Sequence, residues 1–344
     1  VHDAGTTQTD GLFTVTQGKV EGKALSAADF DGSSDYFSQT DSALNYTNNF
    51  TLAAWIRPDS VSTQLVVLSR GGTDNASSQY TFGINSQQIR LTKEGVDNLD
   101  SGTNVLVADK WNHIAVTISS TDGVTFYHNG VNVGTNANTT NCNASSGGFY
   151  VGRRWNGDYD FDGEIKEIKI FDYVKSADQV ASLYSNTYPQ TPEHYWKFDE
   201  GSGNAINSGT SGIGVLSEVG SCGRVNGTLD LDGKLTIAAN GTLSAPNGTL
   251  QLSDDFTIAA DTSTFTHNNG TVEILGNVEL LPADFDSSEN ERHIFYNIAH
   301  SSHTLYIERP TTIENQYTKT GGTARQYTKT TFGTATSAGT MTIN

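Results

Sequence analysis

Short runs in which apolar and polar side chains alternate dominate the first half of the chain. From Phe50 to Arg57, apolar side chains occupy every second position, and Pro58 follows. Alternation of this kind is typical of a strand that buries one face. Proline cannot donate a hydrogen bond to a neighbouring strand, so the strand is predicted to end at Pro58.

Similar runs predict that this half is made mainly of antiparallel strands. Asn129-Gly130 separates two of them and predicts a tight hairpin, because both central residues of such a turn take positive φ. Ser176-Ala177-Asp178-Gln179 has the spacing of a capping box and predicts one short helix near residues 176–184. The other predicted strands cover residues 65–70, 80–84, 89–91, 111–119, 124–128, 131–133, 149–154 and 163–171.

Six segments follow one another in a particular order within residues 18–185. They are Phe30-Asp31-Gly32, Phe50 to Pro58, Trp111 to Thr117, Tyr127 to Gly130, Val151 to Arg153 and Phe161 to Ile170. No single segment is specific, but their order and spacing together resemble the laminin-G-like domains of the concanavalin A-like lectin/glucanase superfamily. The resemblance implies an antiparallel sandwich. It also implies binding or surface architecture more than catalysis.

The opening strand of that family is missing from the amino-terminal end and recurs later. Residues 194–203 match its pattern, aromatic-x-Phe-Asp-Glu-Gly-x-Gly. Residues 223–233 then parallel residues 18–32, and residues 252–260 parallel residues 46–54. We interpret the second half as a degenerate copy of the first, since internal repeats indicate tandem domains.

The predicted fold class is therefore all-β, with two tandem antiparallel β-sandwich (jelly-roll-like) domains and one short helix near residues 176–184. Residues 1–188 are predicted to form the laminin-G/concanavalin A-like sandwich. Residues 189–344 are predicted to form a second, degenerate β-rich domain with a strand-rich tail.

The carboxyl-terminal part is rich in Thr, Asn and Gly and resembles the β repeats of large phage and bacterial surface proteins. The sequence Gln-Tyr-Thr-Lys-Thr occurs at residues 316–320 and again at 326–330. Two interpretations stay open. The tail adds strands to a neighbouring sheet, because an exposed edge accepts a partner strand, or it forms an intramolecular hairpin.

Composition narrows the classes of function. The 344 residues include 35 Gly and only 6 Pro, as many short strands with tight turns require. The net charge of −18 repels phosphate backbones and argues against nucleic-acid binding. No apolar run is long enough to span a bilayer. The chain starts at Val1, so a leader could have been removed. Cys142 and Cys222 allow either one disulfide or two free thiols.

Signals of hydrolytic chemistry are weak. Glycosidases on related sandwiches use two converging carboxylates, but Glu164 and Glu167 are predicted to lie on opposite strand faces. Asp160 and Asp162 share a face, but the neighbouring glycines suggest a turn. The sequence contains no Gly-x-Ser-x-Gly, His-Glu-x-x-His or phosphate-loop motif. We predict that the protein is not an enzyme.

One candidate metal site precedes Gly163. Asp158, Asp160 and Asp162 alternate with aromatic residues and could offer several oxygen ligands to Ca²⁺. The alternative is an acidic surface turn. No cofactor is predicted to be required.

Three aromatic residues near predicted turns are candidates for carbohydrate binding. Tyr80, Trp155 and Tyr159 could stack on sugar rings, since aromatic side chains combine an apolar face with a polar edge. The alternative is that they pack along the rim of the sandwich.

These features predict a non-enzymatic structural or adhesive protein, located outside the cell or on a virion surface. A capsid decoration, a tail component and a bacterial cell-surface protein all fit. Its expected partners are further copies of itself or a larger surface assembly, with a glycan as a further candidate. The alternative is a secreted carbohydrate-binding lectin, with or without Ca²⁺, and the third choice is a glycoside hydrolase.

Overall fold

In the computed structural model, the chain forms two compact units. Residues 27–225 make up one unit, and residues 1–26 together with residues 226–344 make up the other. The described residues are 6–9, 13–15, 18–21, 26–40, 42–72, 74–187, 190–211, 214–225, 227–231, 233–246, 248–258, 263–282, 293–307, 311–326, 330–332 and 340–343.

The first unit is an antiparallel β-sandwich, as predicted. Its elements are β4 (Ala27–Asp31), β5 (Tyr36–Gln39), η2 (Ser42–Leu44), β6 (Phe50–Pro58), β7 (Gln64–Gly71), η3 (Asn75–Ser77), β8 (Tyr80–Asn85), β9 (Gln88–Lys93), β10 (Asp97–Asp100), β11 (Asn112–Ser119), β12 (Gly123–His128), β13 (Val131–Asn136), β14 (Gly148–Val151), β15 (Asp162–Phe171), α1 (Ala177–Ser185), β16 (His194–Trp196), β17 (Ser217–Val219) and β18 (Gly223–Val225). One sheet has the order β10-β9-β8-β7-β14-β5-β17. The other has the order β13-β12-β11-β6-β15-β4-β18, with β16 also paired to β15.

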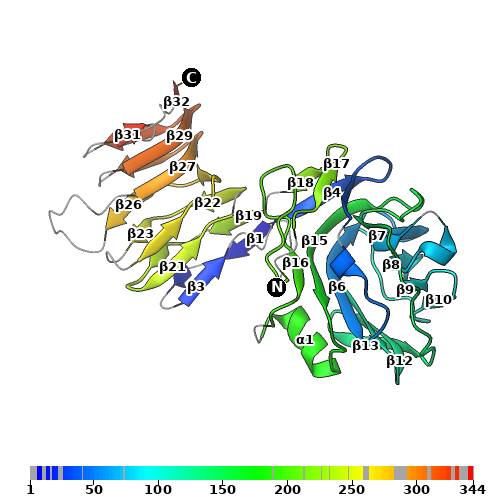
Figure 1. The fold of residues 1–344 in the computed structure, drawn as a ribbon. Coiled ribbons are helices and arrows are strands. Elements are labelled where there is room, and N and C mark those ends of the chain that lie inside the picture. The colour runs from blue at the N-terminus through cyan, green and yellow to red at the C-terminus, as the bar shows by residue number, and fades with distance from the viewer. Residues whose placement is uncertain are drawn as a thin grey trace. The chain divides into compact units, whose positions relative to one another are not determined.

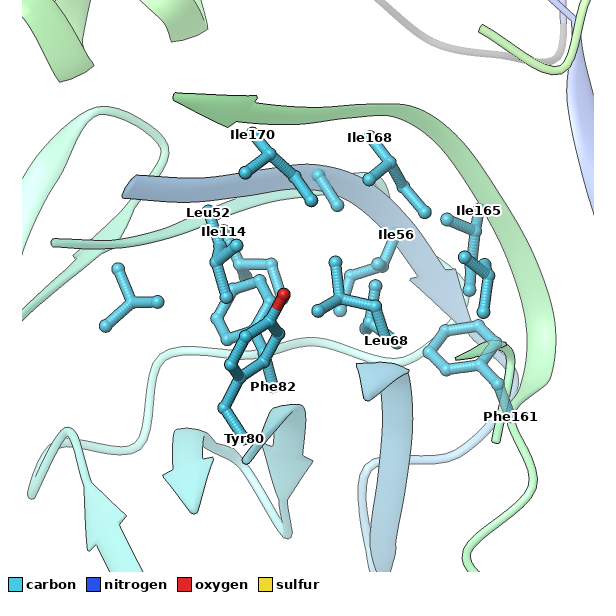
Figure 2. Close-up of a cluster of buried hydrophobic side chains, with 14 of the residues drawn as sticks. Leu52, Ile56, Leu68, Tyr80, Phe82, Ile114, Phe161, Ile165, Ile168 and Ile170 are labelled. Carbon is cyan, nitrogen blue, oxygen red and sulfur yellow. The ribbon is translucent and has the colours of Figure 1, made fainter. Parts of the chain in front are cut away.

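The core of the sandwich lies between the two sheets (Figure 2). Alternate residues of β6, such as Leu52 and Ile56, face the aromatic and aliphatic residues of the opposite sheet, among them Phe82. The other face of β6 is also buried, because Ala53 packs with Val180 of α1. The strand therefore buries both faces, since the helix covers the outside of its sheet.

Local signals in the first half behave as predicted. The Ser176 hydroxyl accepts a hydrogen bond from the backbone N–H of Gln179, whose side chain accepts one in return, so the capping box begins α1. Asn129 and Gly130 have φ values of 48° and 79°, which form the tight turn between β12 and β13. The one short helix and the hairpin are confirmed.

The missing opening strand belongs to this same sandwich. Residues 194–196 form β16 and pair with β15, where Trp196 lies opposite Ile168. Strand β18 pairs with β4, so that Val225 lies opposite Ala27. The structure therefore differs from the division expected at residues 188 and 189. The reason is that residues 194–225 complete sheets whose other strands lie between residues 27 and 171.

The second unit is a β-solenoid of parallel strands, which corrects the expected second antiparallel sandwich. Its strands are β1 (Thr6–Thr9), β2 (Phe13–Val15), β3 (Gly18–Glu21), β19 (Thr228–Leu231), β20 (Leu235–Ile237), β21 (Gly241–Ser244), β22 (Thr249–Leu252), β23 (Phe256–Ile258), β24 (Thr264–Thr266), β25 (Thr271–Ile274), β26 (Val278–Pro282), β27 (His293–His300), β28 (Thr304–Ile307), β29 (Thr311–Lys319), β30 (Thr323–Gln326), β31 (Thr330–Phe332) and β32 (Thr340–Ile343). Each coil places its strands beside the equivalent strands of the next coil. In Figure 1, β1 and β3 accordingly lie beside β19 and β21.

Stacked apolar side chains explain why the solenoid forms. Leu229 pairs in register with Leu250, Leu250 with Val272, and Val272 with Ile298, and all four are buried. A coil cannot bury its apolar side chains alone, but stacking coils produces one continuous core. Strands β1, β2 and β3 supply the first coil, and the sandwich follows before the second coil begins at β19.

The carboxyl-terminal tail pairs within the chain, but not as a hairpin. Strand β29 runs parallel to β27 on one side and to β31 and β32 on the other. The first copy of the Gln-Tyr-Thr-Lys-Thr repeat lies mostly in β29. The second copy begins at Gln326, the last residue of β30, and ends at Thr330, the first residue of β31, which pairs with β29. Residues 327–329 of the second copy lie outside the described residues.

Candidate functional site

A loop between β14 and β15, residues 152–161, is closed by hydrogen bonds at its base. The backbone N–H of Phe161 donates to the carbonyl of Gly152 at 2.7 Å. Gly152 has φ of 87°, and a Cβ there would lie 2.4 Å from the ring of Phe30. Within the loop, the N–H of Arg154 donates to the carbonyl of Asp158 at 3.1 Å. The loop therefore holds Arg154, Trp155 and Tyr159 in defined positions.

Arg154 lines a polar hollow of roughly 340 Å³ at one end of the β7–β8–β9 sheet. The opposite walls are η3 and the hairpin between β9 and β10. Gly95 lies in that hairpin with φ of 70°, a conformation that costs glycine little. The lining residues are Asn75, Thr92, Lys93, Glu94, Gly95, Val96, Asp97, Asn98 and Arg154.

A buried carboxylate fixes the guanidinium of Arg154. Nε donates to Oε1 of Glu94 at 3.0 Å, and Nη2 donates to Oε2 at 2.5 Å. The hydroxyl of Thr81 also donates to Oε1, at 2.6 Å. Hydrogen bonding to Glu94 raises the pKa of Arg154, so the guanidinium stays charged.

Two aromatic residues flank Arg154. Its Cζ lies 5.4 Å from the ring centre of Trp155 and 6.0 Å from that of Tyr159. The Trp155 ring packs against Gly71, and its buried Nε1 has no hydrogen-bond partner among the described residues. Tyr159 is 45% exposed and has φ of 59°. A bulky residue in the left-handed region is strained, and such strain is concentrated at functional sites.

Tyr80 does not join these residues, which corrects the prediction of a sugar-stacking role. It lies in the core beside Phe82, and its hydroxyl donates to the carbonyl of Leu44 at 3.2 Å (Figure 2). Burial raises the pKa of its hydroxyl. The reason is register: Tyr80, Phe82 and Ile84 occupy the inward positions of β8.

The three aspartates predicted as Ca²⁺ ligands lie in and beside the same loop, and the carboxylates of two of them have separate partners. Asp158 accepts a hydrogen bond from Asn156 at 2.5 Å, and Asp160 lies 3.4 Å from Arg153. Burial raises the pKa of both Asp160 and Asp162. Within the described residues, no group of three or more His, Cys, Asp or Glu side chains could hold a metal ion.

The carboxylates considered as a glycosidase pair are each in an ion pair. Glu164 is nearly buried and binds the guanidinium of Arg57 through both oxygens. Glu167 accepts a hydrogen bond from Lys169 at 2.8 Å. Burial raises the pKa of Glu164. Neither carboxylate lines the hollow beside Arg154.

A second hollow, of roughly 650 Å³, lies beside α1. Tyr173, 41% exposed, forms part of its wall. Two amides that line it are already bonded: Gln179 accepts from the N–H of Ser176, and Gln190 donates to the carbonyl of Gln179. These bonds fix two of the side chains that form its wall.

The sequence patterns identified Trp155 and Tyr159 as candidates but did not identify the neighbouring polar residues Glu94 and Arg154. Glu94 and Arg154 meet only because β9 and the 152–161 loop fold against the same end of the sandwich. Gly95 between two short strands was a signal for a turn, but nothing local linked that turn to Arg154. Cys142 and Cys222 are free and buried, and burial raises the pKa of each thiol to about 12.

No helix in the described part of the chain is long and apolar enough to cross a membrane.

Comparison with known proteins finds a family whose model resembles part of the sandwich. Residues 31–181 match the model of the concanavalin A-like lectin/glucanases superfamily. Among curated proteins, none matched the sequence.

Three solved structures are similar to the chain. A protein from Bacteroides ovatus ATCC 8483, described as carbohydrate-binding, is 18% identical with a TM-score of 0.45; the match covers 58% of this chain and 59% of that protein, less than two thirds of its length. A SAP-like pentraxin from Limulus polyphemus is 18% identical with a TM-score of 0.42, covering 56% of this chain and 94% of the pentraxin. Domain 4 of the arabinanase AbnA from Geobacillus stearothermophilus, in complex with arabinotriose, is 20% identical with a TM-score of 0.38, covering 46% of this chain and 76% of that domain.

The antiparallel sandwich and its strand order agree with the match over residues 31–181, and this part of the chain is similar to the concanavalin A-like lectin/glucanases superfamily.

Proposed function

We propose that the sandwich binds carbohydrate at the hollow beside Arg154 and does not catalyse a reaction there. The observation that carries this proposal is Tyr159, an exposed aromatic residue in a strained backbone conformation, whose ring centre lies 6.0 Å from the Cζ of Arg154 in the wall of that hollow. An apolar ring face beside convergent polar groups suits a sugar, which has both C–H faces and hydroxyl groups.

The polar groups of the hollow match the hydroxyl groups of a sugar. Within the described residues, Nη1 of Arg154 and the side-chain amide of Asn98 are free to donate. Asp97 is free to accept through its second oxygen, because the first already accepts from Asn138 at 2.9 Å. A hydroxyl both donates and accepts, so neighbouring hydroxyls could use both kinds of partner.

Binding of the full chain to a panel of immobilised glycans, followed by calorimetry with the best ligand, tests this proposal. We expect Tyr159→Ala to weaken binding about tenfold or more, which corresponds to about 1.4 kcal/mol. Tyr173→Ala is the matched control, since Tyr173 has a similar exposure but lines the other hollow. Equal losses in the two variants, or no binding to any glycan, would overturn the proposal.

The proposed site needs no metal ion. We expect the affinity for the best glycan to be the same in calcium and in chelator, because the polar groups that line the hollow are present without an ion. A strict calcium requirement would favour a site built around Asp158, Asp160 and Asp162 instead.

A second candidate function, surface display, is supported by the solenoid. The sandwich is joined at both ends to coils of the solenoid, an arrangement that suits a binding domain carried on a larger extracellular or virion assembly. The two functions are compatible. Light scattering with calcium and with chelator tests self-assembly: a closed oligomer or polymer supports display, whereas a monomer in both conditions contradicts assembly from this chain alone.

A further inference from the structure

The two cations that line the hollow, Arg154 and Lys93, both have partners within the protein. Glu94 and Arg154 form a bidentate ion pair in which the carboxylate is 1% exposed. A bidentate pair of this kind leaves the guanidinium with little net attraction for a second anion. The guanidinium of Arg154 is therefore not available to bind an anionic ligand.

The second cation of the hollow is directed elsewhere. The ammonium of Lys93 donates to the carbonyls of Asn138 and Thr140, at 2.9 and 2.7 Å. It also lies 3.4 Å from the side-chain oxygen of Asn138. An ammonium has three protons, so these acceptors occupy its donor capacity. Lys93 consequently fixes the 138–140 segment and presents no proton to the hollow.

The exposed charges near the opening are acidic. Asp97 lines the hollow, is exposed, and has one carboxylate oxygen free of partners among the described residues. Asp158 lies close enough to Arg154 to raise the pKa of Arg154, after the larger contribution of Glu94. The whole chain carries a net charge of −18, which adds a long-range repulsion for anions.

We propose that this site selects uncharged sugars and rejects sugars that carry a carboxylate or a sulfate. The inference rests on the proposed carbohydrate-binding function and names its ligand class. Hydroxyl groups of a neutral sugar donate to Asp97 and accept from Arg154 Nη1 and from the amides of Asn75 and Asn98. An anionic group at the same place meets Asp97 without an uncompensated cation, and this repulsion provides the discrimination.

Matched pairs of oligosaccharides that differ only in a carboxylate or sulfate test the inference. The full chain is titrated with each neutral sugar and with its uronic acid, sialylated or sulfated counterpart. We expect neutral members to bind about tenfold more tightly or better, the ratio that 1.4 kcal/mol of repulsion gives. We also expect their affinity to change little with NaCl concentration, because no net charge is neutralised on binding.

Two variants make the test specific. Asp97→Asn removes an exposed charge at little risk to folding, and it is expected to reduce the preference for neutral sugars. Glu94→Gln leaves Arg154 without its compensating carboxylate, while an amide oxygen still accepts from Thr81, and it is expected to increase affinity for the acidic members. Asp178→Asn, at an exposed aspartate in the first turn of α1, is the control and is expected to leave the preference unchanged.

The outcomes separate this inference from the function on which it rests. Acidic sugars that bind as tightly as their neutral partners, or more tightly, overturn the selection and leave carbohydrate binding intact. The preference for neutral sugars could also be the same in the wild type, in Asp97→Asn and in Glu94→Gln. That result would assign the discrimination to another surface and would also overturn the inference. Failure of every neutral and acidic probe to bind overturns the proposed function itself.

Discussion

Ala27 and Val225, the first and last residues of the sandwich, are paired on the neighbouring antiparallel strands β4 and β18. The two points at which the chain enters and leaves the sandwich therefore lie side by side. Domains whose ends are adjacent tolerate insertion into another fold, because the host chain is interrupted at a single place. Strands that precede the sandwich in the chain pair with strands that follow it, as β1 does with β19 and β3 with β21. The fold into which the sandwich is inserted is therefore the solenoid.

Residues 27–225 are expected to fold as an isolated protein. Their apolar core is contained within this segment, so excision removes none of its packing partners. A fragment of residues 27–188, which ends at the boundary that the sequence suggested, lacks β16, β17 and β18. We expect circular dichroism and thermal unfolding to show a cooperative transition for the longer fragment, and a weak or absent transition for the shorter one. Equal stability of the two fragments would contradict the observed division.

Trp196→Ala is expected to destabilise the sandwich by about 3–5 kcal/mol, the usual cost of removing a large buried aromatic side chain. Trp196 is fully buried, and its ring centre lies 5.6 Å from that of Phe149 in a stacked arrangement. Chemical denaturation of residues 27–225 measures the change. Tyr195→Ala is the neighbouring control, because Tyr195 is only partly buried, and it should cost clearly less. A small effect of Trp196→Ala would show that β16 is not integral to the core.

His113 makes the stability of the sandwich depend on pH. Burial lowers its pKa from 6.5 to about 3, with Lys169 as a further cause. Above pH 6.5 the ring is neutral in both the folded and the unfolded state, and its contribution to stability is complete. As the pH falls from 6.5 towards 3, the unfolded state binds a proton that the folded state cannot bind, so the free energy of unfolding decreases by up to about 1.4 kcal/mol per pH unit.

His113→Phe tests this contribution. The substitution keeps an aromatic ring between Trp55 and Tyr184 and removes the titrating group. We expect the stability of the variant to fall less steeply between pH 6.5 and 3 than that of the wild type. His128 and His300, whose pKa values are also lowered by burial, contribute the same slope to both proteins. Parallel pH profiles would rule out His113 as a source of the pH dependence.

Tyr159→Gly is expected to stabilise the sandwich and to weaken the proposed glycan binding about tenfold or more. Relief of left-handed strain is worth about 1–3 kcal/mol, whereas the added freedom of glycine in the unfolded chain costs about 0.5–1 kcal/mol. Tyr159→Ala should lose binding equally without gaining stability, because alanine keeps the strain. Thermal unfolding and glycan titration of both variants measure the two effects. A loss of stability in the glycine variant would show that Tyr159 has a structural role.

The first half was predictable because its signals are local. The alternation from Phe50 to Arg57, the Asn129-Gly130 turn and the capping box at Ser176 each define an element without reference to distant residues. The pattern of residues 194–203 was also recognised, but a strand pattern does not specify which sheet the strand joins. Its pairing with β15 depends on a long-range contact, so it was assigned to the wrong domain.

The solenoid was misinterpreted because an inward–outward alternation looks the same in parallel and antiparallel strands. Thr228-Leu229-Asp230-Leu231 and Thr249-Leu250-Gln251-Leu252 were compatible with either. The same pattern of alternating residues recurs a third time in β25, and this repetition was the signal of stacked coils. At the candidate site, Tyr159 was predictable as an aromatic residue near a turn. The ion pair of Arg154 with Glu94 was not, since it joins segments that meet only in the folded sandwich.

The position of the sandwich within the chain has a consequence for biosynthesis. During translation the first coil, β1 to β3, leaves the ribosome long before β19 to β21, its pairing partners. Domains fold as they emerge, and pairing across a long separation is slow because the intervening chain must first be brought together. A folded sandwich shortens that separation to the distance between Ala27 and Val225, which are paired. We therefore expect folding of the sandwich to bring the first coil close to the coils that are made after it.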